Sequence, residues 1–373
     1  MGHFATAEEQ YLIRHGTSVD EVKKIWWPFM LNLGWVFILP HQPFSCPSSA
    51  DTFRQNRSSY DLATYMDASK SKMLVVLPRS TNEPVGHIQA TIYDNKTGWV
   101  AMFIVEQACR GLGYGRALFE TAMDEFTRNG TKYVGLDGVA EQKKTYERRG
   151  FVESQLGLVK CMYRNLTSHA PLVAAGRSLG LPKDTELCAL SMVPNRLLVQ
   201  SDLAHTGFER NGLWTEEFFN RPDVFGSALM RERCTRSRRS TVGKLDDVLA
   251  WVVVRRSVQG YRIGPLYAKD TESARIVLTS AMEDAGPGRM NSTPLDNETP
   301  YDKDVEEISE KAQLAVEIWS GNPAAEALFT ELGWQFLGVD YHRMWLGGEA
   351  TPEQSEGGLA HKGMFAVFDA AIG

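Results

Sequence analysis

A glycine-rich stretch with the sequence VEQACRGLGYGR occupies residues 105–116, between an apolar run and a helical pattern. Its alternating glycines allow successive backbone N–H groups to converge on an anion, and a following helix N-terminus adds free donors and partial positive charge. Arg110 and Arg116 add formal charge. A dinucleotide fingerprint would need glycine at position 116, and a P-loop would need Gly-Lys-Ser/Thr, so both are excluded. The stretch therefore predicts a pyrophosphate site, and a turn that only reverses the chain is the alternative.

A second motif, LDGVAEQKKTYERRGF at residues 136–151, lies downstream of the first. Together the two motifs resemble the GCN5-related N-acetyltransferases (GNATs). Members of that family carry an acetyl-CoA loop of the form Q/R-x-x-G-x-G/A, then a strand and a short helix that ends in Tyr-x-x-x-Gly-Phe. The resemblance covers roughly residues 10–165.

The resemblance implies acetyl-CoA as co-substrate and assigns roles to the matching residues. The backbone of the central strand, at Phe103, Ile104 and Val105, would pair with the pantetheine amides. Tyr146 would lie near the thioester sulfur and protonate the leaving thiolate, although a tyrosine that only packs on a short helix is the alternative. The pyrophosphate would be cradled by the loop residues Arg110, Gly111, Leu112, Gly113, Tyr114, Gly115 and Arg116.

Acetyl transfer to nitrogen requires a neutral amine. An alkyl amine with a pKa near ~10.4 is neutral in only about 1 part in 10³ to 10⁴ at pH 7, and general acid–base assistance typically contributes ~10²–10⁴-fold. Glu106, at the end of the central strand, is our candidate for the base; Asp137 and His87 are weaker candidates. A structural role for each, or a water chain in place of a base, stays open. Cys109 has no histidine near it in the sequence, and the resemblance implies direct transfer.

The second half of the chain repeats this order of elements in altered form. Residues 315–334 resemble the downstream motif, with Phe329 in the place of Tyr146, and a phenylalanine cannot donate a proton. The upstream segment 260–270 lacks alternating glycines, and Asp270 is predicted to cap the following helix and repel a pyrophosphate. We expect a degenerate GNAT-like domain that shapes the acceptor site or the domain interface. Possible acceptor contacts, each with a structural role as the alternative, are His205, Arg210, Tyr267 and His342.

The periodicity predicts two α/β units with a similar order of elements, and the resemblance implies that they are two tandem GNAT-like domains with mixed sheets. We divide the chain into a catalytic acetyl-CoA-binding domain at 1–166, a linker at 167–183 and a degenerate domain at 184–373. Ser18 and Glu21 match a capping box. Strands are predicted at 10–15, 73–77, 85–93, 99–105, 132–136, 156–163, 227–232, 248–255, 261–266, 315–319 and 365–368. Helices are predicted after Ser18 and at 118–126, 143–149, 271–282 and 323–332.

The composition narrows the class of protein further. The 373 residues carry a net charge of −6, which gives no basic field for nucleic acid. The five cysteines are scattered without a zinc pattern, so we expect free thiols, no metal and a cytoplasmic location. The apolar segment 26–39 is too short for a membrane span and reads as core or as an acceptor-pocket wall. An arginine-rich run at 231–239 reads as a solvated turn, or as an attractor of an anionic acceptor or of the coenzyme's 3′-phosphate.

These observations predict an acetyl-CoA-dependent N-acetyltransferase that acts on a small primary amine by direct transfer. The partners would be acetyl-CoA and an amine acceptor, with no nucleic acid and no membrane. A protein lysine N-acetyltransferase and a non-catalytic acyl-CoA-binding module are the alternatives.

Overall fold

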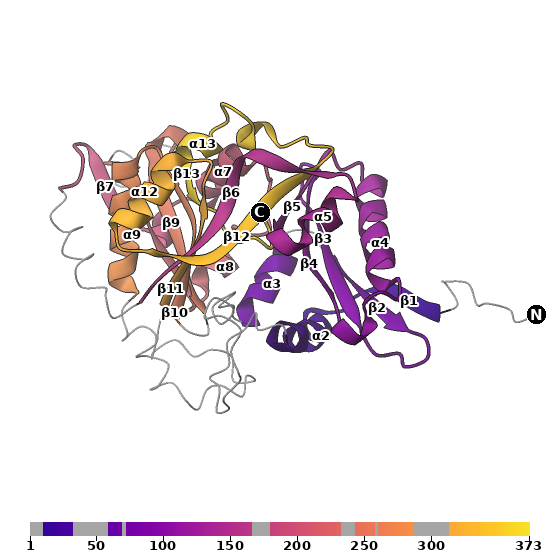
Figure 1. The fold of residues 1–373 in the computed structure, drawn as a ribbon. Coiled ribbons are helices and arrows are strands. Elements are labelled where there is room, and N and C mark those ends of the chain that lie inside the picture. The colour runs from indigo at the N-terminus through magenta and orange to yellow at the C-terminus, as the bar shows by residue number, and fades with distance from the viewer. Residues whose placement is uncertain are drawn as a thin grey trace, which may run out of the picture.

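A thirteen-stranded mixed sheet forms the centre of the computed structural model (Figure 1), in the order β1-β2-β3-β4-β5-β12-β6-β11-β13-β10-β9-β8-β7. The structure describes residues 10–32, 59–68, 72–165, 180–232, 243–257, 260–285 and 313–373. The arginine-rich run falls largely outside these ranges, as do residues 33–39 of the apolar segment and most of the predicted linker.

The strands fall into two series along the chain. The first series comprises β1 (Tyr11–His15), β2 (Lys72–Pro78), β3 (Gly86–Ile92), β4 (Thr97–Val105), β5 (Tyr133–Val139) and β6 (Phe151–Asn165). The second comprises β7 (Thr185–Ala189), β8 (Val224–Arg231), β9 (Val248–Ser257), β10 (Gly260–Ala268), β11 (Gln313–Trp319), β12 (Gln335–Leu346) and β13 (Met364–Ala366).

Helices cover both faces of the sheet. The α-helices are α2 (Val19–Asn32), α3 (Ser59–Asp67), α4 (Tyr114–Arg128), α5 (Lys143–Glu147), α7 (Asn195–Thr206), α8 (Glu216–Asn220), α9 (Thr271–Asp284), α12 (Pro323–Glu331) and α13 (Ala360–Gly363). Single turns of 3₁₀ helix are η2 (Gln107–Cys109), η3 (Ala140–Gln142), η5 (Leu190–Met192), η7 (Leu245–Asp247) and η8 (Pro352–Gln354).

Alternation along the strands divides the core into layers. In β2, Leu74 and Val76 pack in a cluster with α4, whereas Met73, Val75 and Leu77 belong to the cluster that contains α2 and α3. Successive side chains of a strand point to opposite faces, so this single strand serves two cores. A third cluster packs α9 and α12 on the second series of strands.

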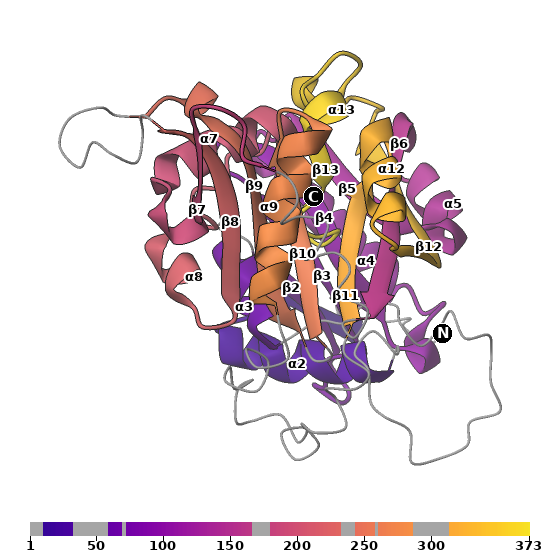
Figure 2. The same ribbon diagram turned by 90° about the vertical axis from the view of Figure 1, so that its left-hand side faces the viewer.

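The two series exchange one strand each. β12 lies between β5 and β6, and β6 in turn lies between β12 and β11 (Figures 1 and 2). Tyr341 of β12 pairs with Val139, and Val159 of β6 pairs with Trp319 in the corresponding register. A continuous sheet therefore joins the two series. β12 of the second series lies next to β5, and β6 of the first series lies next to β11.

Each series contains a pair of parallel strands that separate after four residue pairs. β4 pairs with β5 from Thr97↔Tyr133 to Val100↔Leu136, and β10 pairs with β11 from Gly260↔Gln313 to Ile263↔Val316. A register shift follows at the same place in both, and it leaves Met102 at φ 49°. The bulge turns each strand away from its parallel neighbour.

The predicted strands and helices of both halves are present, with shifted ends. The largest miss is β12, which was not predicted; β6 is also longer than expected, and α3 and α7 were missed. The capping box is half right. Ser18 Oγ accepts from the Glu21 N–H at 3.1 Å, but the Glu21 carboxylate binds Thr17 and Arg14 instead of returning to the Ser18 N–H.

Candidate active site

A cavity of about 1180 Å³ opens where β4 separates from β5. It extends from the glycine loop past α4 and α5 to β12. Its lining residues are Phe103, Ile104, Val105, Arg110, Gly111, Gly113, Gly115, Arg116, Phe119, Glu120, Met123, Asp124, Val139, Glu141, Gln142, Thr145, Tyr146, Arg148, Arg149, Val339 and Tyr341.

The glycine loop leads from the end of β4 into α4. Gly113 is the N-cap of α4 with φ 91°, a left-handed conformation that glycine adopts without steric cost, and it makes no side-chain cap bond. The first N–H groups of the helix are therefore uncapped by a side chain, and Gly113 and Gly115 line the cavity. A Cβ on Gly115 would meet Phe103 Cζ at 3.3 Å, so a side chain there would narrow the passage between loop and strand.

Three residues that the sequence assigned to the site do not line the cavity. Leu112 points outward with 63% of its surface exposed. Tyr114 packs edge-on against Tyr11, at 5.7 Å between ring centroids. Glu106 is exposed, and its carboxylate lies 4.0 Å from the Cys109 thiol.

The Tyr146 side chain extends from α5 into the cavity and passes over Gly138 of β5, where the strand carries no side chain. A Cβ on Gly138 would lie 2.8 Å from the Tyr146 ring, so only glycine lets the ring rest on β5. Burial raises the pKa of Tyr146 to about 12, although the nearby Arg149 acts in the opposite direction. The phenol is therefore protonated across the physiological range and is suited to donate a hydrogen bond.

Positive charge gathers along the same cavity. Arg149 stacks over the Phe119 ring at 4.7 Å and donates to the Thr145 carbonyl at 2.7 Å. Arg110, Arg116 and Arg148 also line the cavity, whereas its carboxylates are fewer. The arginines suit a ligand that carries several phosphates, and the glycine loop leaves space for such a ligand. These residues therefore fit the pyrophosphate and pantetheine of acyl-CoA. Arg148 and Arg149 both lie in the motif at 136–151, but nothing in that motif marks them as phosphate ligands.

The alternative base candidates are not available to a substrate. Arg343 binds both carboxylate oxygens of Asp137, at 2.9 and 2.6 Å, and both side chains are fully buried. His87 is fully buried, and burial lowers its pKa to about 4. Among the cavity residues, Glu141 is an exposed carboxylate beside α5 that sequence reasoning did not consider.

The second half of the chain contributes directly to this cavity. Val339 and Tyr341 of β12 line it next to Val139 of β5. No local motif marks them, because their position depends on β12 pairing with a strand about 200 residues earlier in the chain. Their side chains add apolar surface to the lining of the cavity.

The corresponding positions of the second half are closed. Asp270 caps α9 by accepting from the Ser273 N–H at 2.8 Å, as predicted. Phe329, in the place of Tyr146, is fully buried against Trp334. A helix start capped by its own carboxylate and a buried apolar ring offer nothing to a phosphate or a thioester.

The proposed acceptor contacts are structural. Asp202 receives two bonds from Arg210, at 2.8 and 2.5 Å, and one from Tyr267 at 2.8 Å. His205 stacks on Tyr267 at 4.4 Å, and burial lowers its pKa to about 4. His342 bonds to the Glu153 carboxylate behind α5.

Residues 42–160 match the family model described as an acetyltransferase (GNAT) domain. This chain contains a GNAT domain. The family predicted from the two motifs is thereby confirmed, and the prediction of an acyltransferase is confirmed at the level of the family.

One curated relative agrees with this assignment. Holothin acyltransferase from Pseudoalteromonas sp. (strain SANK 73390) is 24% identical over 189 residues, which cover 51% of this chain and 54% of that protein. The alignment thus spans about half the length of this curated relative.

Solved structures resemble the whole chain. A putative acetyltransferase from Pyrococcus horikoshii gives a TM-score of 0.61 at 16% identity, over 100% of this chain and 99% of that one. A tandem GNAT protein from the clavulanic acid biosynthesis pathway gives 0.58 at 12% identity, over 92% and 100%. At these identities the likeness shows the fold, and it confirms the predicted α/β architecture of a tandem GNAT protein.

Within the described ranges, no helix has the length and apolarity needed to cross a membrane. The same ranges contain no group of three or more His, Cys, Asp or Glu side chains arranged to hold a metal ion.

Proposed function

We propose that this protein is an acetyl-CoA-dependent N-acetyltransferase that transfers the acetyl group directly to a small primary amine. The observation that carries the proposal is the cavity at the β4/β5 separation, where the uncapped start of α4, four arginines and Tyr146 meet. Acetyl-CoA is the second substrate: its phosphates would lie at the glycine loop and its thioester near Tyr146. We also propose that catalysis belongs to residues 1–166, that 167–183 are a linker, and that the protein works in the cytoplasm.

In the reaction, the amine nitrogen attacks the thioester carbonyl, the C–S bond breaks, and the proton lost by nitrogen ends on the thiol. With its pKa near 12, Tyr146 is a weaker acid than a thiol of pKa ~8.5. Full proton transfer from the phenol to the thiolate is therefore uphill. The role of Tyr146 is to stabilise the developing thiolate by donating a hydrogen bond, while the ammonium proton leaves through water, with Glu106 outside the cavity lining as a base that water would have to connect to the amine.

Two considerations favour a small acceptor over a protein. The second half of the chain joins the same sheet and supplies β12 to the cavity, which restricts the room for a long peptide beside the catalytic centre. Two relatives are named for holothin and for clavulanic acid biosynthesis, and neither name specifies a protein substrate.

The test is Tyr146→Phe, measured for acetyl-CoA binding and for thiol release with a library of amines. The phenylalanine keeps the ring that rests on Gly138, so the dissociation constant of acetyl-CoA should change less than about threefold. Turnover should fall by ~10²–10³-fold, the typical cost of removing one hydrogen-bond donor that stabilises charge in the transition state. An acyl-CoA-binding module without catalysis would show binding and no turnover in the unmutated protein, which would reject the proposal.

A further inference from the structure

The separation between β10 and β11 is the counterpart of the one that forms the cavity. Phe103 lies three residues beyond the last β4/β5 ladder pair, and Leu266 lies three residues beyond the last β10/β11 pair. Gly138 of β5 corresponds to Ile318 of β11, because each lies two residues beyond the last ladder pair of its strand. The two slots can therefore be compared position by position.

In the second slot, β13 occupies the space between the separating strands. Leu266 and Ile318 both pair with the same residue, Ala366, one on each side of β13. The Val367 N–H donates to the Glu317 carbonyl at 3.0 Å. In the first slot, Phe103 and Val139 instead line the open cavity.

The fit of this segment in the second slot is tight. A Cβ on Gly264 would lie 2.2 Å from the Val367 carbonyl oxygen, so the backbone at Gly264 has no room for a side chain. Leu266, Ile318 and Ala366 are all fully buried. Asp369 fixes the end of the segment by accepting from Tyr65 at 2.8 Å and from Arg262 at 3.0 Å.

We infer that residues 364–367, here called the slot segment, occupy in the second half the place that the pantetheine arm would take in the first. Both are extended chains whose amide groups bond to the edges of two diverging strands. The second half is thus a peptide-binding slot permanently filled by its own chain, and the protein takes one acyl-CoA. The expectation of one acyl-CoA per chain rests on the proposed function. The filling of the second slot by the slot segment does not.

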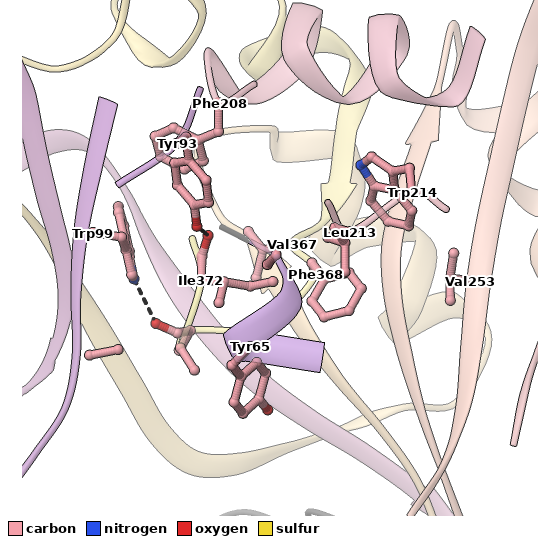
Figure 3. Close-up of a cluster of buried hydrophobic side chains, with 14 of the residues drawn as sticks. Tyr65, Tyr93, Trp99, Phe208, Leu213, Trp214, Val253, Val367, Phe368 and Ile372 are labelled. Atoms are coloured by element: carbon pink, nitrogen blue, oxygen red, sulfur yellow. Dashed lines mark hydrogen bonds between the residues drawn. The ribbon is translucent and has the colours of Figure 1, made fainter. Parts of the chain in front are cut away.

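The filled slot also reaches the active half. Beyond the slot segment, the Ala370 carbonyl accepts from Trp99 Nε1 at 2.9 Å, and the Ile372 carbonyl accepts from the Tyr93 hydroxyl at 2.6 Å (Figure 3). Trp99 belongs to β4, three residues before the bulge at Met102. Occupation of the second slot therefore buttresses the strand on which the first slot is built.

Calorimetric titration of the full-length protein with acetyl-CoA tests the stoichiometry. We expect one equivalent per chain in the unmutated protein, and the same single site weakened by ~10-fold or more in Gly113→Glu. Two equivalents, or one equivalent that binds Gly113→Glu with unchanged affinity, would overturn the inference and leave the acetyltransferase intact. No binding to the unmutated protein would reject the proposed function, and the geometry would then be judged by hydrogen exchange.

Hydrogen exchange in the full-length protein tests the geometry without any ligand. The Val367 amide and its neighbours should exchange as slowly as those of the core strand β10. Exchange as fast as in the connection 347–358 would overturn the inference.

Gly264→Ala, which forces a methyl group against the Val367 carbonyl, should speed exchange of the slot segment by about 10-fold or more. Gly357→Ala is the matched control, because Gly357 also has a left-handed φ (80°) but nothing within 4 Å, and it should leave the slot segment unchanged. Equal exchange in the two variants would contradict the inference; if Gly264→Ala does not fold, the unmutated protein alone decides.

Discussion

A negative charge placed at Gly113 tests the anion site at its centre. Gly113 has φ 91° and open space around it, so a longer side chain meets no neighbour in the free protein. Gly113→Glu therefore changes two things: it strains the backbone, and it puts a carboxylate where we expect the pyrophosphate. Gly113→Gln carries the same strain and nearly the same shape without the charge, and the pair isolates the electrostatic effect.

The size of that effect follows from Coulomb's law. Two unit charges 4 Å apart repel by ~1 kcal/mol in water and by ~4 kcal/mol at an effective dielectric constant of 20, which corresponds to ~5-fold and ~10³-fold in affinity. The loop is exposed, so we expect a value between these limits, a ~10–100-fold weaker acetyl-CoA affinity for Gly113→Glu than for Gly113→Gln. The strain of a left-handed non-glycine residue, ~1–2 kcal/mol, lowers the stability of both variants alike.

Ligand-dependent stability is a suitable assay. Acetyl-CoA at 100 times its dissociation constant stabilises a protein by ~2.7 kcal/mol. At the same ligand concentration, a 10–100-fold loss of affinity reduces this to about 1.4–0.4 kcal/mol. Gly357→Glu controls for strain and added charge away from the cavity and should keep the full stabilisation. Equal stabilisation of the Glu and Gln variants at Gly113 would refute an anion at the start of α4.

Three further predictions concern ionisable groups. Because the pKa of Tyr146 is about 12, kcat/KM should rise with pH as the amine loses its proton and show no falling limb below about pH 11; a falling limb near pH 9 would contradict the role of the phenol. His87 and His205 have pKa values of about 4 in the folded state, against an ordinary value of ~6.5, so the unfolded state binds protons first. The free energy of unfolding therefore has its full value above about pH 6.5 and falls toward pH 4 by ~1.4 kcal/mol per pH unit for each histidine. His205→Gln should reduce this dependence on pH, measured by urea titrations at several pH values. An unchanged dependence would show that His205 does not contribute to it. Arg343→Met leaves the buried Asp137 without its counter-charge and should destabilise the protein by ~3–5 kcal/mol in urea, most of which Asp137→Leu combined with Arg343→Met should restore. A loss under 1 kcal/mol for Arg343→Met alone would show that the pair is not buried as described.

Local patterns made the loop and its helix predictable. Alternating glycines, a following 3.6-residue period and the Tyr-x-x-x-Gly-Phe ending are all contained within short windows of sequence. The same holds for Asp270, whose cap depends only on the three residues after it. These features need no knowledge of what the rest of the chain does.

The features that were missed depend on distant pairing. β12 has the sequence QFLGVDYHRMWL, in which charged residues interrupt the apolar pattern of a central strand. The interruption is explained by Arg343, which lies fully buried against Asp137 from 206 positions earlier in the chain. Without that partner, the sequence shows Asp137 only as a carboxylate at the end of a strand and a candidate base.

The exchange of β6 and β12 ties the second half of the chain to the cavity in the first half. If β12 were absent, the edge of β5 would be unpaired, Asp137 would lose its only described counter-charge, and the cavity would lose the wall formed by Val339 and Tyr341. In the opposite direction, β6 of the first series supplies the strand next to β11. Each half completes the sheet of the other, so the second half contributes to the cavity although it has neither the glycine loop nor the tyrosine of the first half. Its own slot is occupied by β13, and the strand that it supplies to the cavity is β12.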